Sequence, residues 1–510
     1  MIGAPSAVPR PVSLPIGARA VLAAAALGVL AALGVVASSP TVAYLCFAAV
    51  ALALVCLLVV ATGHRLFWAL LLFLLAGYAF FSKGFAYLGW NGVYVGELCL
   101  GLGLLTLLVR AAGLRLRMRE LHVPADMLAL GAFIVWQIGC TLPYLERYGA
   151  DALRDAVLWG YAAFAFLIVL VVPRSAVDRF PALYGRCVGV FLAWLLAAWV
   201  LGTVLKWKVM MPGTGLALLQ IKAGDVGVHL GGVAAFLLLR LEGGQQAWRP
   251  RTLWLLWLLW WACWVPFGIA NRAGMISALL GLGVTVLLRP RSRWDRPLVM
   301  GLAGILVLLA GGNLLQLKDK SLSLDQVGKN LASVVSDTEP RLDTTKQWRL
   351  EWWQAIIEDT VQPDHAVFGQ GYGLSLGERY GRAGRDGSLR SPHNAFMTIL
   401  ARSGLPGLIL WVIFLAALLV RLLRQGTSPP SSGEDGRNRA VWLLAYLVAF
   451  IFHACFDVFL EGPMGGIWFW SLVGVSWLTR PQSDPSTALN PGAQHRPGFK
   501  WQAADARGTR

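Results

Sequence analysis

The stretch that decides the fold runs from residue 253 to residue 289 and reads LWLLWLLWWACWVPFGIANRAGMISALLGLGVTVLLR. Two apolar segments of about 20 residues, each long enough to cross a hydrocarbon layer of roughly 30 Å as a helix, are joined by a short link that contains Arg272. Such segments recur along nearly the whole chain of 510 residues, of which 57% are hydrophobic. A soluble protein cannot cover so many apolar side chains with polar surface, so the sequence predicts an all-α polytopic membrane protein.

The lengths of the apolar runs predict about 12–14 transmembrane helices. These predicted spans lie at residues 16–38, 41–62, 65–81, 92–112, 123–143, 153–172, 184–204, 222–240, 252–269, 273–289, 297–315, 394–424, 439–460 and 464–479. The first run has no obvious processing site and is followed almost at once by another run, so we interpret it as a span rather than a signal peptide.

Clusters of arginine predict the orientation. If the N-terminus is cytoplasmic, alternate loops fall inside and carry the clusters, such as Arg115, Arg117 and Arg119, as the positive-inside rule requires. Both termini are then cytoplasmic. The net charge of +17 is explained by this topology and does not require a nucleic-acid partner.

One long loop interrupts the pattern of short connections. It covers residues 316–392 on the predicted outer side, between the first eleven helices (residues 1–315) and the C-terminal helices (residues 393–480), and loops of this length are usually functional or disordered. Residues 345–361 predict an amphipathic helix with Trp348, Trp352, Trp353 and Ile356 on its apolar side. Residues 481–510 are rich in Pro, Gly, Gln and Arg and predict a disordered cytoplasmic tail.

Cations on the predicted outer side are unusual under the positive-inside rule and need a reason. Arg272 is the clearest case, because its short link places it at the membrane boundary. A guanidinium group there suits a phosphate or pyrophosphate, which it can grip bidentately, although snorkelling to lipid headgroups also explains a single arginine. The candidate anion-binding cations are Arg272, Arg349, Arg341, Lys83 and Arg390.

His393 lies in the segment LRSPHNAF at residues 389–396, directly before a long apolar run. A neutral imidazole at the membrane boundary can accept a proton, so His393 is the candidate general base. A capping or headgroup contact is the alternative for a single histidine.

Further ionisable residues lie within or beside the predicted spans. His453, Asp457 and Glu461 are spaced by four and share one helix face that reaches the outer side, and Lys222 and Asp225 share the outer end of another span. Such residues are functional candidates, with helix-packing ion pairs as the alternative. We predict that His453, Asp457 and Glu461 support the residues that contact substrate and do not contact it themselves.

Several catalytic motifs are absent from the sequence. It contains no HExxH, GxxxxGK[ST] or DxD pattern and no CxxC pair among its seven cysteines, which leaves metalloprotease, ATPase and nucleotide-sugar chemistry without support. We therefore predict no metal and no cofactor. The GQGYGL segment at residues 369–374 resembles a nucleotide-binding loop, but without a flanking strand and helix it predicts a tight turn.

The order of these pieces resembles the O-antigen ligase and polymerase family of bacterial membrane glycosyltransferases. The matching segments, within residues 252–477, are Asn-Arg-Ala-Gly at 271–274, Arg-Leu-Glu-Trp-Trp-Gln-Ala at 349–355, Gly-Gln-Gly-Tyr-Gly at 369–373, Ser-Pro-His-Asn-Ala-Phe at 391–396 and Gly-Leu-Pro-Gly at 404–407. The segment at residues 401–404 departs from the pattern, because an acidic residue often precedes this glycine, and acceptor recognition could therefore differ.

The resemblance implies a GT-C-like enzyme of the bacterial inner membrane with a periplasmic active site. It would move a glycan from an undecaprenyl-pyrophosphate carrier to an acceptor hydroxyl without metal or nucleotide. His393 would then activate the acceptor, and Arg272 and Arg349 would bind the pyrophosphate. Its partners would be the carrier-linked donor, lipid A core or another glycan as acceptor, and membrane lipids.

Three functions remain open at the level of sequence. Ligation of O-antigen to lipid A core is the first, and polymerisation of O-antigen or exopolysaccharide from the same donor is the alternative, because donor and base are shared. A polysaccharide flippase or transporter is less well supported, since internal repeats and paired broken helices typical of transporters are not evident.

Overall fold

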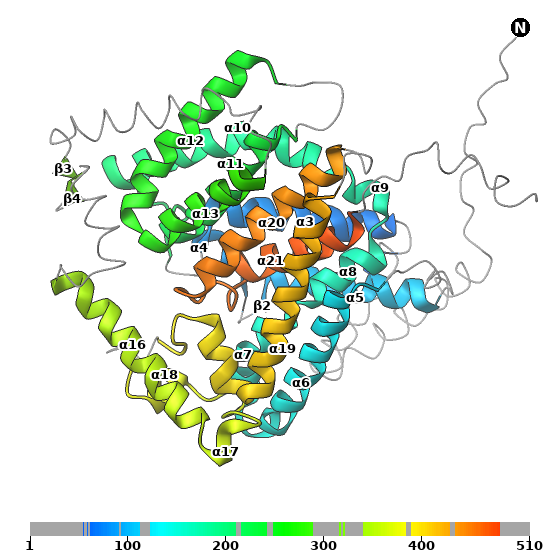
Figure 1. Ribbon diagram of the computed structural model, residues 1–510, viewed down its shortest axis with the longest axis vertical. Coiled ribbons are helices and arrows are strands. Elements are labelled where there is room, and N and C mark those ends of the chain that lie inside the picture. Colours follow the sequence, from blue (N-terminus) through cyan, green and yellow to red (C-terminus); the bar gives the residue numbers. More distant parts are fainter. Residues whose placement is uncertain are drawn as a thin grey trace, which may run out of the picture.

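The computed structural model describes residues 55, 59, 62–90, 93–112, 123–210, 216–241, 248–288, 316–317, 320–321, 340–383, 389–428 and 434–479. The regular structure of these residues is almost entirely helical (Figure 1). Two short antiparallel ladders pair Gly89–Trp90 (β1) with Val93–Tyr94 (β2) and Gln316–Leu317 (β3) with Lys320–Ser321 (β4). The predicted all-α fold is confirmed.

Each predicted span that falls within the described residues overlaps a helix or, at 153–172, a bent pair of helices. The span predicted at 439–460 is wrong at its end, because the helix stops at Ala454, so Asp457 and Glu461 lie beyond it and do not share a helix face with His453. By length and composition, five described helices could cross a membrane, or six if the bent pair counts as one span. The described α-helices are α3 (His64–Phe81), α4 (Lys83–Ala86), α5 (Val95–Ala112), α6 (Ala125–Tyr148), α7 (Ala150–Gly160), α8 (Ala163–Val171), α9 (Arg174–Val177), α10 (Phe180–Trp199), α11 (Ala223–Leu239), α12 (Pro250–Ala270), α13 (Arg272–Leu288), α16 (Pro340–Thr360), α17 (Pro363–Ala366), α18 (Leu376–Arg379), α19 (Ala395–Gly426), α20 (Glu434–Ala454) and α21 (Pro463–Leu478). A π-helical turn, η3 (Val200–Val204), continues α10.

The predicted spans at 16–38 and 297–315, and most of the span at 41–62, lie outside the described residues, as does the predicted tail at 481–510. The count of about 12–14 transmembrane helices therefore stays a prediction.

Helix α11 forms the centre of the bundle. Its residues from Gly224 to Leu239 are all buried, as expected for a helix that is apolar on every side. It packs against α13 and α20 (Figure 1). A side chain at Gly227 would collide with the backbone of Gly274 in α13, so glycine permits the close crossing, and small residues serve the same purpose in other membrane helix pairs. This crossing fixes the N-terminal ends of both helices beside each other.

Two helical segments are interrupted. Helices α7 and α8 meet at a bend of 56°. Helix α19 loses helical geometry at Gly404, where φ is 67° and ψ is −168°, two residues before Pro406. The carbonyl groups freed near this break are used by other segments: Ala401 O accepts from Gln370 N at 2.7 Å and Ser403 O accepts from Trp136 Nε1 at 2.9 Å. The break in α19 therefore provides the docking point for the loop that precedes it.

The glycine-rich segment predicted as a tight turn docks on α6 and α19. Gly371 and Gly373 have positive φ angles of 73° and 99°, and a side chain at either would collide with the ring of Tyr144 or Tyr148 in α6. Glycine is needed here both for the backbone conformation and for the close approach.

Helices α16, α17 and α18 gather at one end of the bundle, beside the ends of α6 and α19 (Figure 1). We call this the loop-bearing end. The helix predicted at residues 345–361 is part of α16, and its buried Trp352 and Ile356 pack with Leu376 and Leu400. Trp353, expected on the same apolar side, instead points to the turn before α19, where its Nε1 donates to Pro392 O. It thereby links α16 to the candidate base.

Candidate functional site

His393 lies in a turn directly before α19, rather than in the helix. The helix begins at Ala395, because the Asn394 side chain caps it by accepting hydrogen bonds from Phe396 N and Met397 N. His393 has a φ of 55°, a left-handed conformation that is uncommon for residues other than glycine. Such strained residues persist only where their surroundings hold them, and they cluster at active sites.

Two neighbouring elements hold this turn. Trp353 of α16 donates to Pro392 O at 2.8 Å. Glu461, in the link between α20 and α21, accepts hydrogen bonds of 2.8 Å from the hydroxyl groups of Ser391 and Thr398. Burial raises the pKa of Glu461 against the opposing effect of these two hydrogen bonds. The imidazole of His393 is thus placed by contacts on both sides of the turn.

Asp457 lies next to the imidazole of His393. It follows α20, and its Oδ1 is 3.5 Å from His393 Nδ1 and accepts a hydrogen bond of 2.8 Å from Val458 N. Its Oδ2 accepts from Lys222 Nζ at 3.0 Å. Burial alone would raise the pKa of Asp457, but the contact with His393 and the positive charge of Lys222 outweigh it and lower the pKa well below its usual value. The carboxylate is therefore ionised at neutral pH.

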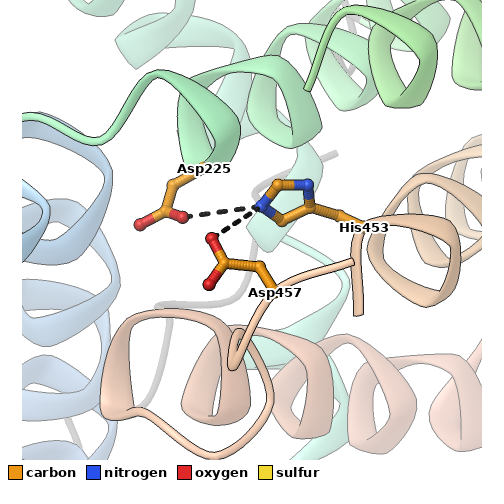
Figure 2. A group of neighbouring side chains, drawn as sticks. All are labelled: Asp225, His453 and Asp457. Carbon is orange, nitrogen blue, oxygen red and sulfur yellow. Dashed lines mark ion pairs between the residues drawn. The ribbon is translucent and has the colours of Figure 1, made fainter. Parts of the chain in front are cut away.

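The N-terminal end of α11 brings further charges to this carboxylate. Asp225 accepts a hydrogen bond of 3.0 Å from Ser82 Oγ, and its Oδ1 is 3.9 Å from Lys222 Nζ. Burial alone would lower the pKa of Lys222, but the Asp225 and Asp457 carboxylates outweigh it and raise the pKa. Figure 2 shows the imidazole of His453, from α20, directed between the same two carboxylates. Asp225, His453 and Asp457 are close enough together to hold a metal ion.

Two of the predicted cations lie at this site. Arg349 of α16 donates from Nη1 to Phe456 O at 3.1 Å, next to Asp457. Its pKa is lowered, first by burial and further by the positive charge of Arg272, while Asp457 acts in the opposite direction. Arg272 is the first residue of α13, behind Asn271, which caps the helix by accepting from Gly274 N at 2.8 Å. The structure thus brings Arg272, Arg349, Asp457 and His393 together.

The other predicted cations are placed differently. Arg390 donates to Asp155 Oδ2 at 3.2 Å and to Gly373 O at 3.0 Å, so its guanidinium group ties the loop to α7. Lys83 lies over the ring of Tyr87, with 5.9 Å between Nζ and the ring centroid. Arg341 is in the first turn of α16, and its side chain lies outside the described residues.

Ser82 and Trp353 are site residues that the sequence did not reveal. Ser82 precedes the singled-out Lys83 and has a φ of 47°, but its link to Asp225 joins residues 143 positions apart. The sequence pattern places Trp353 on the apolar face of its helix. It also places Lys222 and Asp225 at one end of a span, but no pattern in the sequence indicates that Lys222 reaches Asp457, 235 residues away.

The fold and the site define a class: a multi-pass helical membrane protein with a histidine, a carboxylate and two arginines at one end of its bundle. Comparison with known families gives a match over residues 257–412 to the family described as O-antigen ligase. The chain therefore carries an O-antigen ligase domain, which O-antigen ligases and polymerases share and which implies transfer of lipid-linked glycans. No curated protein matches the chain.

The match covers part of the site. Arg272, Arg349 and His393 lie within residues 257–412, whereas Lys222, His453 and Asp457 lie outside them. Asp457 and its neighbours Lys222 and His453 are therefore contributed by the segments that flank the matched region.

Proposed function

We propose that this protein transfers a glycan from undecaprenyl pyrophosphate to an acceptor hydroxyl at the periplasmic face of the bacterial inner membrane, and that the acceptor is lipid A core. The observation that carries the proposal is the position of His393, with its Nδ1 3.5 Å from Asp457 Oδ1 and with Arg349 bonded to Phe456 O next to that carboxylate. The O-antigen ligase domain supplies the reaction class.

The proposed reaction uses His393 as general base. Asp457 holds a proton on Nδ1, which leaves Nε2 as the basic nitrogen that receives the proton of the acceptor hydroxyl. The hydroxyl oxygen forms a bond to the anomeric carbon of the donor while the bond from that carbon to the pyrophosphate oxygen breaks. The electron pair leaves with the pyrophosphate, and attack from the opposite side inverts the anomeric centre.

Arg272 and Arg349 are the proposed pyrophosphate ligands. Negative charge grows on the leaving group as the sugar bond breaks, and preorganised guanidinium groups stabilise it more strongly in the transition state than in the bound donor. Arg341 stays a candidate at the periphery, because eight residues of helix place its backbone about 12 Å from that of Arg349. Arg390 and Lys83 are less suited to this role, since the loop and Tyr87 already engage them.

The test is a strain from which the gene has been deleted, examined for lipid A that carries polymer and for carrier-linked polymer. Ligation predicts that carrier-linked polymer still lengthens while none becomes attached to lipid A. Loss of lengthening would instead identify a polymerase, which uses the same donor and base. Unchanged amounts of both products would contradict glycan transfer from this carrier.

A further inference from the structure

Asp225, His453 and Asp457 form a compact set of donor atoms (Figure 2), of which the proposed transfer reaction uses Asp457 alone. His453 Nε2 lies 3.8 Å from Asp225 Oδ1 and 3.7 Å from Asp457 Oδ2. In a tetrahedral site with bonds of about 2.0–2.2 Å, neighbouring ligand atoms are roughly 3.4 Å apart. The two distances to His453 exceed this spacing by a few tenths of an ångström, and the three donor atoms lie within 4.8 Å of one another, so a small inward movement of the carboxylates would let all three bind one ion.

The donor atoms are buried and poorly paired. The His453 side chain is fully buried, and neither of its ring nitrogens has a hydrogen-bond partner among the described residues. Asp225 Oδ1, which faces the same space, also has none there. Leaving buried polar atoms without partners is costly in free energy. A cation near the Asp225 and Asp457 carboxylates would offset this cost.

Lys222 supplies that cation from within the chain. Its ammonium group lies 3.0 Å from Asp457 Oδ2 and 3.9 Å from Asp225 Oδ1, on the two carboxylates that a metal ion would bind. A divalent ion and an ammonium group sharing Asp457 would repel each other at close range, where burial weakens screening by water. The two cations therefore exclude each other.

We propose that Asp225, His453 and Asp457 form a divalent-cation site that the ammonium group of Lys222 keeps closed. Removing the ammonium group opens the site to an ion that accepts one imidazole and two carboxylates, a donor set that suits Zn²⁺. The built-in cation keeps Asp457 charged beside His393 without any dissociable ion. The inference concerns metal binding and can fail or succeed independently of glycan transfer.

The experiment measures Zn²⁺ binding to the purified full-length protein in lipid nanodiscs after treatment with a chelator. Lys222→Met removes the charge, and Lys222→Arg is the matched control that keeps it. The double variant Lys222→Met with His453→Gln removes the nitrogen donor. Bound Zn²⁺ is determined by elemental analysis after gel filtration, and thermal unfolding is followed with and without the ion.

We expect Lys222→Met to retain about one Zn²⁺ per chain and to unfold at higher temperature when the ion is present. Wild type, Lys222→Arg and the double variant should retain none beyond background. Lys222→Gln serves as the second variant if the methionine does not yield folded protein, because its amide can still donate to Asp457.

Two results would overturn the proposal. One is a folded Lys222→Met or Lys222→Gln protein that binds no more Zn²⁺ than wild type. The other is a wild-type protein that holds one Zn²⁺ which His453→Gln removes, because Lys222 would then not close the site.

Discussion

Two groups of carboxylates and cations lie at the loop-bearing end of the helices, and they differ in what their polar atoms contact. In the Asp155 cluster (Asp155, Arg390 and Arg402), Asp155 Oδ2 lies 2.8 Å from Arg402 Nη2. It also accepts hydrogen bonds from Arg390 Nη2 at 3.2 Å and from Gly373 N at 3.0 Å. In the Asp457 cluster (Asp457, His393, Lys222, His453 and Asp225), the contacts to both histidines are 3.5 Å or longer, and the His453 ring nitrogens have no hydrogen-bond partner within the described part of the chain.

The difference in contacts indicates a structural role for the Asp155 cluster and a chemical role for the Asp457 cluster. The Asp155 cluster joins the glycine-rich turn to α7 and α19 through short bonds, including those from Arg402 Nη1 to Gly371 O and Leu374 O at 3.3 Å, and Arg402 is only 2% exposed. The Asp457 cluster keeps a partly exposed imidazole in a strained turn. Similar residue types thus hold a loop in one place and leave a proton acceptor accessible in the other.

The largest effect is expected from His393→Ala. Glycan transfer should fall by about 10²–10⁴-fold, the usual contribution of a general base, while the protein stays in the membrane. The rate is measured in membranes supplied with carrier-linked glycan. His365→Ala is the matched control, since His365 lies in the same loop but pairs with Asp359 at 3.2 Å. Equal rates in wild type and His393→Ala would remove His393 from catalysis.

Asp457→Asn should have the next largest effect. The imidazole remains, but the group that fixes its proton on Nδ1 loses its charge, so we expect the rate to fall by roughly 10- to 100-fold. Asp359→Asn, in the loop, is the control and should transfer glycan at the wild-type rate. An Asp457→Asn protein that is fully active would show that the 3.5 Å contact serves packing alone.

Arg349→Lys and Arg272→Lys should each weaken use of the donor by about tenfold in kcat/KM, because lysine keeps the charge but loses the bidentate grip on pyrophosphate. The kinetics are measured while the concentration of carrier-linked donor is varied. Arg379→Lys is the control, because Arg379 pairs with Asp359 in the loop. Full activity of both lysine variants would indicate that each arginine acts as a simple point charge.

Helix positions could be predicted from the sequence, because the length of an apolar run depends directly on the thickness of the bilayer. The meeting of Arg272, Arg349 and His393 followed from their motifs and from the common side of their loops. The pairing of Arg390 with Asp155, in place of the predicted contact with pyrophosphate, could not be predicted. These two residues are 235 positions apart and meet because the glycine-rich turn docks on α6 and α19. The left-handed backbone of His393 likewise depends on Trp353 and Glu461, which no local pattern reveals.

Arg402→Met tests the other side of the comparison. Removing one partner of a buried pair leaves Asp155 with less compensation and should lower the free energy of unfolding by about 3–5 kcal/mol, while the transfer rate per folded molecule stays close to that of wild type. Thermal unfolding of the purified protein gives the first quantity. Arg379→Met, which removes a more exposed pair, should cost at most about 1 kcal/mol. A loss of rate as large as that of Asp457→Asn would show that the Asp155 cluster takes part in catalysis.

Glu461→Gln should have the smallest effect on transfer, because glutamine can still accept hydrogen bonds from Ser391 and Thr398 and so hold the turn. Its effect should appear in the free energy of unfolding.

Burial raises the pKa of Glu461 in the folded protein above the usual value of 4.5, so the folded state binds this proton more tightly than the unfolded chain. The stability contributed by the proton is complete below pH 4.5 and is lost as the pH rises through the raised pKa. The stability of Glu461→Gln relative to wild type should therefore increase with pH across this interval and then level off. Thermal unfolding of both proteins at a series of pH values measures this difference. A variant less stable than wild type at neutral pH would mean that a cation compensates the Glu461 carboxylate.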